Sequence, residues 1–171
     1  MKRVTIKDVA RAAGVSYTTV SRALSGSSDI GEETRRRILQ ISQEMGYSPN
    51  SVARSLVAQE TKTIGLIINN ITSPFTSEVT WYIEEQAWLH GYSLILCNSC
   101  SSVEKEQAAV ELLTSRQVDG IIIHPADDQS FDRLFPYIST TPTVFINEDM
   151  GERPTSYVTI DNYKGAWMGT E

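Results

Sequence analysis

The spacing of small, glycine and aliphatic residues in residues 5–24 constrains the fold more than any other feature of the chain. Apolar side chains recur at helical spacing before Gly14, and glycine reaches the left-handed conformation that a sharp turn needs. Ser16 can cap a second helix, in which Val20 packs back beneath the turn. Ala10 is small enough for the two helices to cross closely. The spacing therefore predicts two short helices joined by a tight turn.

The outward face of the second predicted helix is suited to the major groove of DNA, where a helix pair of this kind places its second helix. The residues on that face are Tyr17, Thr18, Ser21 and Arg22. Arginine can pair bidentately with guanine, which discriminates against a wrong base by about 1–3 kcal/mol. Four hydroxyls are predicted to contact phosphates, which fix register but carry no sequence information: Thr5, Ser16, Thr19 and Thr34. The alternative is a generic helical hairpin.

Two further helices are predicted before residue 60. Residues 32–45 form the first, with Ile38 on its inner side, and its arginines at 35–37 suit either a solvated face or contacts with the DNA backbone. Pro49 cannot continue a helix, and Asn50 can cap a short one from residue 51 to about 58. Because that segment has no obvious core, we expect it to order only against a second copy and DNA.

Residues 4–57, and more loosely the whole chain, resemble the lactose/galactose-repressor family of bacterial transcription regulators. In that family a hinge helix follows the three-helix head, pairs with its dimer mate and wedges a leucine into the minor groove. The resemblance implies that Leu56 is this wedge, and that Ala53 and Arg54 contact the same groove. It also implies a homodimer on a pseudo-palindromic double-stranded operator. An ordinary linker helix is the alternative for this segment.

One position departs from the family pattern. The family usually has serine or a similar cap at position 31, opening the third helix and touching phosphate, whereas this chain has Gly31. Glycine at an N-cap costs only a few tenths of a kcal/mol relative to serine. We therefore expect the helix to form without a side-chain phosphate contact there.

Charge is distributed unevenly along the chain. Residues 1–60 hold nine Lys/Arg and six Asp/Glu, a net of +3, and residues 61–171 hold six and fifteen, a net of −9. The charge that favours DNA therefore lies at the head, despite the overall net charge of −6. Neither an apolar run of transmembrane length nor a signal peptide is evident, so we expect a cytoplasmic protein without membrane contact.

After residue 61 strands and helices alternate, which predicts a parallel, right-handed α/β sheet. The expected strands are 63–68, 93–97, 118–123, 143–146 and 157–160, with helices at 76–90, 102–116, 130–138 and from about 163. The expected organisation is a helix-turn-helix head (1–46), a hinge helix and linker (47–60), and one α/β lobe of periplasmic-binding-protein type (61–171). Because chains of the family are about twice as long, we expect this lobe to be incomplete and effector binding to be weak.

Polar residues follow each predicted strand, where ligands of such sheets bind. They are Asn69-Asn70, Asn98-Ser99, His124-Pro125, Asn147-Glu148 and Asp161-Asn162. This amide-rich edge suits a hydroxylated molecule and lacks the glycine-rich turn of a phosphate site, although each residue alone could be a turn former. The family's second part is similar to periplasmic sugar-binding proteins, which implies a sugar-like effector. The predicted effector residues are Phe75, His124, Asn147 and Asp161, with Ser73 replacing the asparagine of the family's Asn-Pro-Phe signature.

Other chemistry has weaker support in the sequence. Cys97 and Cys100 form a Cys-x-x-Cys at a strand end, whereas a redox motif usually opens a helix, and neither a metal site nor a cofactor is predicted. Trp81 and Trp88 are expected to pack on the sheet, with the dimer interface as the alternative. The predicted function is a DNA-binding transcriptional regulator, a repressor controlled by a small effector, without catalytic residues. The alternative is an α/β enzyme or redox protein with an accessory helical head.

Overall fold

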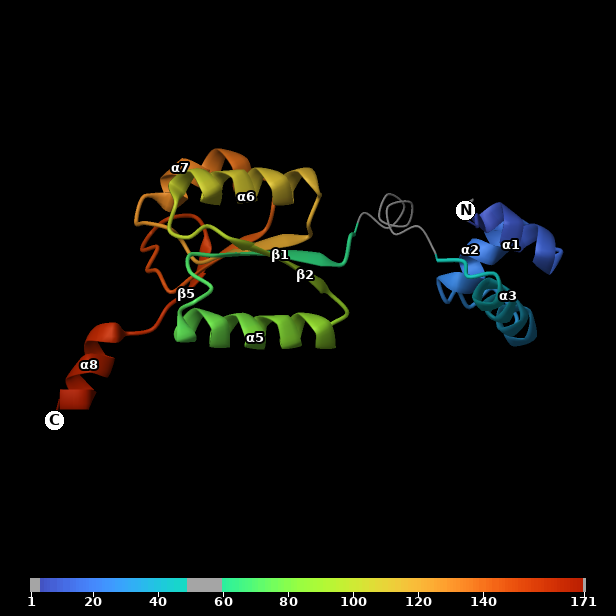
Figure 1. Cartoon of the computed structure of the whole chain (residues 1–171), viewed down its shortest axis with the longest axis horizontal. Helices are drawn as coiled ribbons and strands as arrows, with labels where there is room; N and C mark the ends of the chain where they lie inside the picture. The colour runs from blue at the N-terminus through green and yellow to red at the C-terminus, as the bar shows by residue number, and fades with distance from the viewer. Residues whose placement is uncertain (1–3, 49–59, 171) are drawn as a thin grey trace. The chain divides into compact units, whose positions relative to one another are not determined.

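The computed structural model describes residues 4–48 and 60–170. The chain divides into two compact units, Met1–Val57 and Ala58–Glu171, each with its own secondary structure (Figure 1). Within the described ranges, none of the helices is long and apolar enough to cross a membrane.

The first unit is the three-helix head that the spacing predicts. It consists of α1 (Ile6–Ala13), α2 (Tyr17–Leu24) and α3 (Glu32–Glu44). Gly14 ends α1 at a φ of 64°, in the left-handed region that glycine enters without a steric penalty. The Oγ of Ser16 caps α2 by accepting a hydrogen bond from Thr19 N at 3.1 Å. As expected, α3 forms behind Gly31, which supplies no side-chain cap.

A small core joins the three helices. Val9, Val20 and Ile38, one from each helix, are fully buried. Ala10 is also buried, and its carbonyl accepts a hydrogen bond from Val15 N at 3.1 Å, which closes the turn. The close crossing of α1 and α2 therefore depends on the small side chain and the glycine turn that the sequence combines.

Two of the three arginines on α3 bind the head itself. Arg37 donates from Nη2 to the carbonyl of Ala13 at 3.0 Å, and Arg35 donates from Nη2 to the carbonyl of Ser27. Arg36 is exposed. Arg37 thus satisfies a carbonyl at the end of α1, which has no helical partner, and Arg35 binds the turn that follows α2.

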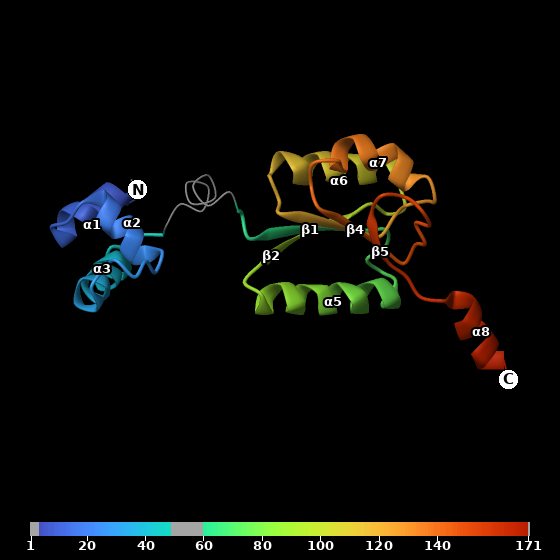
Figure 2. The same ribbon diagram turned by 180° about the vertical axis from the view of Figure 1, so that it is seen from behind.

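The second unit is a five-stranded parallel sheet with strand order β2-β1-β3-β4-β5. Its strands are β1 (Thr63–Ile68), β2 (Ser93–Asn98), β3 (Gly120–Ile123), β4 (Thr143–Ile146) and β5 (Ser156–Val158). Its helices are α5 (Pro74–Leu89), α6 (Val103–Ser115), α7 (Ser130–Ile138) and α8 (Asn162–Thr170). α5 covers one face of the sheet, and α6 and α7 cover the other (Figures 1 and 2).

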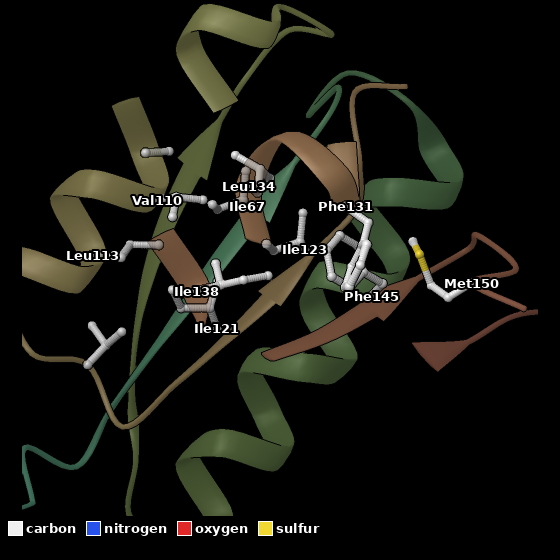
Figure 3. Packing of buried hydrophobic residues seen from close by; sticks show 12 residues of the cluster. Ile67, Val110, Leu113, Ile121, Ile123, Phe131, Leu134, Ile138, Phe145 and Met150 are labelled. Carbon is white, nitrogen blue, oxygen red and sulfur yellow. The ribbon is translucent and has the colours of Figure 1, made fainter. Parts of the chain in front are cut away.

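The main core of this unit lies between the sheet and the layer of α6 and α7 (Figure 3). Leu113, Ile123 and Phe145 are fully buried there. Gly65 of β1 passes so close to α6 that a Cβ at its position would lie 2.5 Å from Cδ1 of Leu113. The absence of a side chain at Gly65 therefore lets Leu113 seat on the sheet.

The expectation that Trp81 and Trp88 pack on the sheet is wrong. Their exposed fractions are 56% and 74%. The side of α5 that approaches the sheet carries smaller side chains at helical spacing, namely Thr76, Val79, Thr80, Ile83 and Ala87, all buried or half-buried. Because that stripe already fills the contact, the two tryptophans lie outside it.

The Gly65 contact gives a test of the sheet–helix packing. We expect Gly65→Ala to lower the free energy of unfolding by about 1–3 kcal/mol, because the new methyl group displaces Leu113. Tryptophan fluorescence during urea unfolding reports this unit alone, since Trp81, Trp88 and Trp167 all belong to it. Gly65→Ala should cost less in a Leu113→Ala background, and additive losses would contradict the contact.

Candidate nucleic-acid interface and polar rim

The outward residues of α2 form one exposed surface, as the sequence predicts. Tyr17, Thr18, Ser21 and Arg22 are all exposed. They occupy successive turns of the helix, and the opposite side buries Val20 and Ala23. Tyr17 stands 61% exposed at the first position of α2. A major groove admits a helix of this width, so all four side chains can reach base edges or phosphates together.

Three of the four predicted phosphate-binding hydroxyls already form hydrogen bonds within the head. Thr5 donates from its Oγ1 to Oδ2 of Asp8 at 2.6 Å, and its backbone N donates to the same oxygen at 3.0 Å. The hydroxyls of Ser16 and Thr19 lie 2.9 Å apart, so one of them donates to the other. Thr34 is half-buried in the first turn of α3. The contact of these four hydroxyls with phosphate stays a prediction. The minor-groove contacts of Ala53, Arg54 and Leu56 also stay predictions, because these three lie outside the described residues.

The side chains of Asn69, His124 and Asn147 meet at the carboxyl ends of the central strands. We call these three residues, together with Phe75 of α5, the polar rim. His124 Nε2 lies 3.3 Å from Nδ2 of Asn69 and 3.2 Å from Nδ2 of Asn147. The ring of Phe75 approaches the His124 ring edge-on, at 6.4 Å between centroids. The structure therefore brings together three of the four predicted effector residues and adds Asn69, which follows β1.

Burial lowers the pKa of His124 from its ordinary value of 6.5, which favours the neutral imidazole at this edge. A neutral imidazole has a single acceptor nitrogen, so the two amide groups share one lone pair at Nε2. The outer amide and ring groups can exchange hydrogen bonds with a hydroxylated ligand, and Phe75, 45% exposed, offers an apolar face beside them. Such a set suits an uncharged polar molecule better than an ion.

Asp161, the fourth predicted effector residue, takes part in a different contact. Its Oδ1 accepts a hydrogen bond from Lys164 N at 2.8 Å, at the start of α8. Among the described residues no contact joins Asp161 to the polar rim. Its role toward an effector stays a prediction.

Sequence reasoning missed a buried carboxylate that fixes the loop after β3. Glu106 of α6 is fully buried. It accepts hydrogen bonds from Ala126 N at 2.7 Å and from Ser130 Oγ at 2.8 Å. Arg133 pairs with it at 3.3 Å and with Asp127 at 3.0 Å, and the hydrogen bond from Arg133 is the main cause that lowers the pKa of Asp127. The loop that begins at His124 is therefore held by Glu106, which binds Ala126 and Ser130, and by Arg133, which binds Asp127.

A second carboxylate fixes the chain where it enters the sheet. Asp119 accepts hydrogen bonds from Thr61 N at 2.7 Å, Thr61 Oγ1 at 2.8 Å and Lys62 N at 2.9 Å. Burial opposes ionisation of Asp119, but these hydrogen bonds outweigh it and lower the pKa. Asp119 is 58 positions from Thr61 and 57 positions from Lys62 along the chain. Contacts between such distant residues leave no local pattern in the sequence.

The two cysteines are both free thiols. Burial raises the pKa of Cys97, which disfavours its reactive thiolate, and Cys100 is exposed.

Comparison with known proteins agrees with this arrangement. Residues 5–50 match the model of bacterial regulatory proteins of the lacI family, and residues 64–171 match that of a periplasmic binding protein domain. The chain therefore carries a DNA-binding head of the LacI family and a domain of the periplasmic-binding-protein family.

The relatives that the chain matches are named as transcription regulators. It is 37% identical to the transcriptional repressor PurR of Pasteurella multocida over 98% of its length, and 39% identical to the regulator RegA of Clostridium saccharobutylicum over 96%. The crystal structure of the Lac repressor dimer bound to operator and the anti-inducer ONPF superposes with a TM-score of 0.86 at 29% identity, covering 99% of this chain and 52% of that one. The chain spans about half the length of the curated relatives it matches.

Stability of the lobe should depend on pH through His124. The pKa of His124 is lower in the folded state than in the unfolded state, so the unfolded state binds the proton more readily. The folding stability that His124 contributes is fully present above pH 6.5 and is lost as the pH falls. We expect the urea concentration at the unfolding midpoint to decrease as the pH is lowered from 7 to 5. His124→Gln should make this midpoint less dependent on pH. Asp119 and Asp127 do not interfere, since their contributions fall away only as pH approaches 3.8. If His90→Gln, at the other histidine, has this effect instead, the assignment fails.

The Glu106 contacts give a second test of the rim's support. Glu106→Ala should cost about 3–5 kcal/mol of unfolding free energy, because Arg133 and two hydrogen-bond donors lose a buried partner. Glu106→Gln keeps an acceptor oxygen and should cost less. Glu111→Ala removes an exposed carboxylate from the same helix and should stay within about 0.5 kcal/mol of the parent. Equal losses for Glu106→Ala and Glu111→Ala, measured by fluorescence, would contradict the role of Glu106.

Proposed function

We propose that this protein is a sequence-specific DNA-binding transcriptional regulator that acts as a repressor. The observation that carries the proposal is the exposed surface of α2, in which Tyr17, Thr18, Ser21 and Arg22 stand together on a capped helix behind a glycine turn. Arg22 and Tyr17 would contact base edges, and the hydroxyls of Thr5, Ser16, Thr19 and Thr34 would contact phosphates. The match of residues 5–50 to the LacI family supports this assignment.

The proposed DNA target is a pseudo-palindromic operator bound by a homodimer. A single small head buries little DNA surface, and two heads related by two-fold symmetry read two half-sites. The head's net charge is only +3, which favours such paired binding. The Lac repressor structure, a dimer bound to operator, supports the same arrangement. We place this activity in the cytoplasm and assign no catalytic step to the chain.

The proposed effector is a small polar molecule such as a sugar, bound at the polar rim by Phe75, His124 and Asn147, with Asp161 completing the set. The neutral His124 and the two amides beside it support this choice, since they offer hydrogen bonds without a full charge. In the related Lac repressor, the anti-inducer ONPF is bound in the same crystal as operator. The effector would change the affinity of the dimer for its operator.

Selection of bound sequences from random double-stranded DNA tests the main proposal. We expect the chain to enrich one sequence with two related half-sites, and enrichment of no sequence would remove the assignment.

Arg22→Ala tests which residue reads a base. It should lower binding to the selected duplex by about 1–3 kcal/mol and relax the preference at one base position of each half-site. Arg36→Ala removes the same charge from an exposed site on α3 and should leave that preference intact. Uniform weakening across all duplexes by Arg22→Ala would contradict base reading.

We further propose that Leu56 wedges between base pairs, with Ala53 and Arg54 contacting the minor groove. Leu56→Ala should then reduce the bend of the selected duplex, because the wedge is what unstacks the base step. A gel-shift phasing assay measures the bend. Leu39→Ala, at an exposed leucine of α3, is the control, and an unchanged bend angle for Leu56→Ala would rule out the wedge.

A further inference from the structure

An acidic side chain stands beside the proposed base-reading arginine. Oδ2 of Asp29 lies 3.8 Å from Nη1 of Arg22. The two side chains are 67% and 57% exposed, so both remain available to a ligand on this surface. Arg22 leaves the last turn of α2, and Asp29 belongs to the turn between α2 and α3.

That turn is fixed by hydrogen bonds that converge on Ser27. Ser27 N donates to the carbonyl of Arg22 at 3.1 Å, and the Ser27 carbonyl accepts from Nη2 of Arg35. The Ser27 Oγ accepts from the backbone N of Asp29 at 3.4 Å. Because these hydrogen bonds hold the backbone of the turn, Asp29 stays beside the last turn of α2, close to the guanidinium of Arg22.

The Asp29 charge acts against DNA binding in general, because a carboxylate on this surface repels phosphates. It also adds little to folding, since exposed ion pairs contribute almost nothing to stability. Its effect must therefore fall on Arg22. A guanidinium has five donors in a rigid fork, and a carboxylate on one side of the fork limits the orientations of the rest.

We infer that Asp29 is a positioning residue that makes Arg22 read a base edge instead of binding phosphate. An unrestrained arginine can turn to the nearest phosphate, which carries no sequence information. With one side of its fork facing Asp29, Arg22 keeps donors directed outward and gains less from a phosphate. This inference rests on the proposed DNA-binding function.

The experiment uses the whole chain and the duplex recovered by selection from random DNA. Binding is measured for the parent, Asp29→Asn, Arg22→Ala and the double variant. The probes are the selected duplex, a set in which each base pair is replaced in turn, and random-sequence DNA. Arg22→Ala first identifies the base position that Arg22 reads. Glu33→Gln, which removes the same charge from the first turn of α3, is the control.

We expect Asp29→Asn to lower discrimination about fivefold at the position read by Arg22 and nowhere else. Binding to random-sequence DNA should rise about threefold, because a repelling charge is gone. In the Arg22→Ala background, Asp29→Asn should leave discrimination unchanged at every position. Glu33→Gln should leave the discrimination pattern of the parent intact.

Two results would overturn the inference: discrimination at that position equal to the parent's, or a loss that persists without Arg22. A purely structural role predicts weakening at all positions alike, which also contradicts it. If the parent chain selects no sequence, the proposed function itself fails. If the parent and Arg22→Ala behave as proposed and Asp29→Asn matches the parent, only the inference about Asp29 fails.

Discussion

The parallel direction of the five strands is the constraint on which the second unit depends. Parallel strands need crossover helices, so helices lie on both faces of the sheet, and the central strands β1 and β3 are almost wholly apolar. The same direction gathers all carboxyl ends at one edge, where Asn69, His124 and Asn147 come together from three strand ends. The side chains there are polar, since the residues that follow the strands lie past the apolar core. The gathering of these polar side chains at one edge is thus a direct result of strand direction.

The head solves a different problem, which is to expose polar side chains on a helix too short to be stable alone. Eight residues of α2 are held by Val20 and Ala23 beneath, by the Ser16 cap at one end and by the turn around Ser27 at the other. Arg35 and Arg37 contribute through carbonyls of neighbouring elements and leave the outer surface of α2 clear. The stability of the exposed surface of α2 therefore comes from residues that lie outside that surface.

Local sequence patterns predicted the helices and strands whose bounds depend on residues close together in the chain. The bounds of β1, β4 and α7 agree with the structure, because apolar runs there are limited by turn residues on each side. Contacts between distant positions were not predictable: a glutamate at position 106 resembles a solvent-exposed one until Arg133 and Ala126 are brought to it by the fold. Trp81 and Trp88 misled for the opposite reason, since their size indicates burial while a stripe of smaller residues takes the sheet contact.

Strand β3 has a consequence beyond its place in the sheet. It is four residues long, with Asp119 directly before it and His124 directly after it. At about 3.3 Å per residue, this short extended strand runs from the amino-terminal end of the sheet to its carboxyl-terminal end. One end holds the segment arriving from the head, through Thr61, and the other carries the centre of the polar rim. The contact that fixes Thr61 and the centre of the polar rim therefore lie at opposite ends of one short strand.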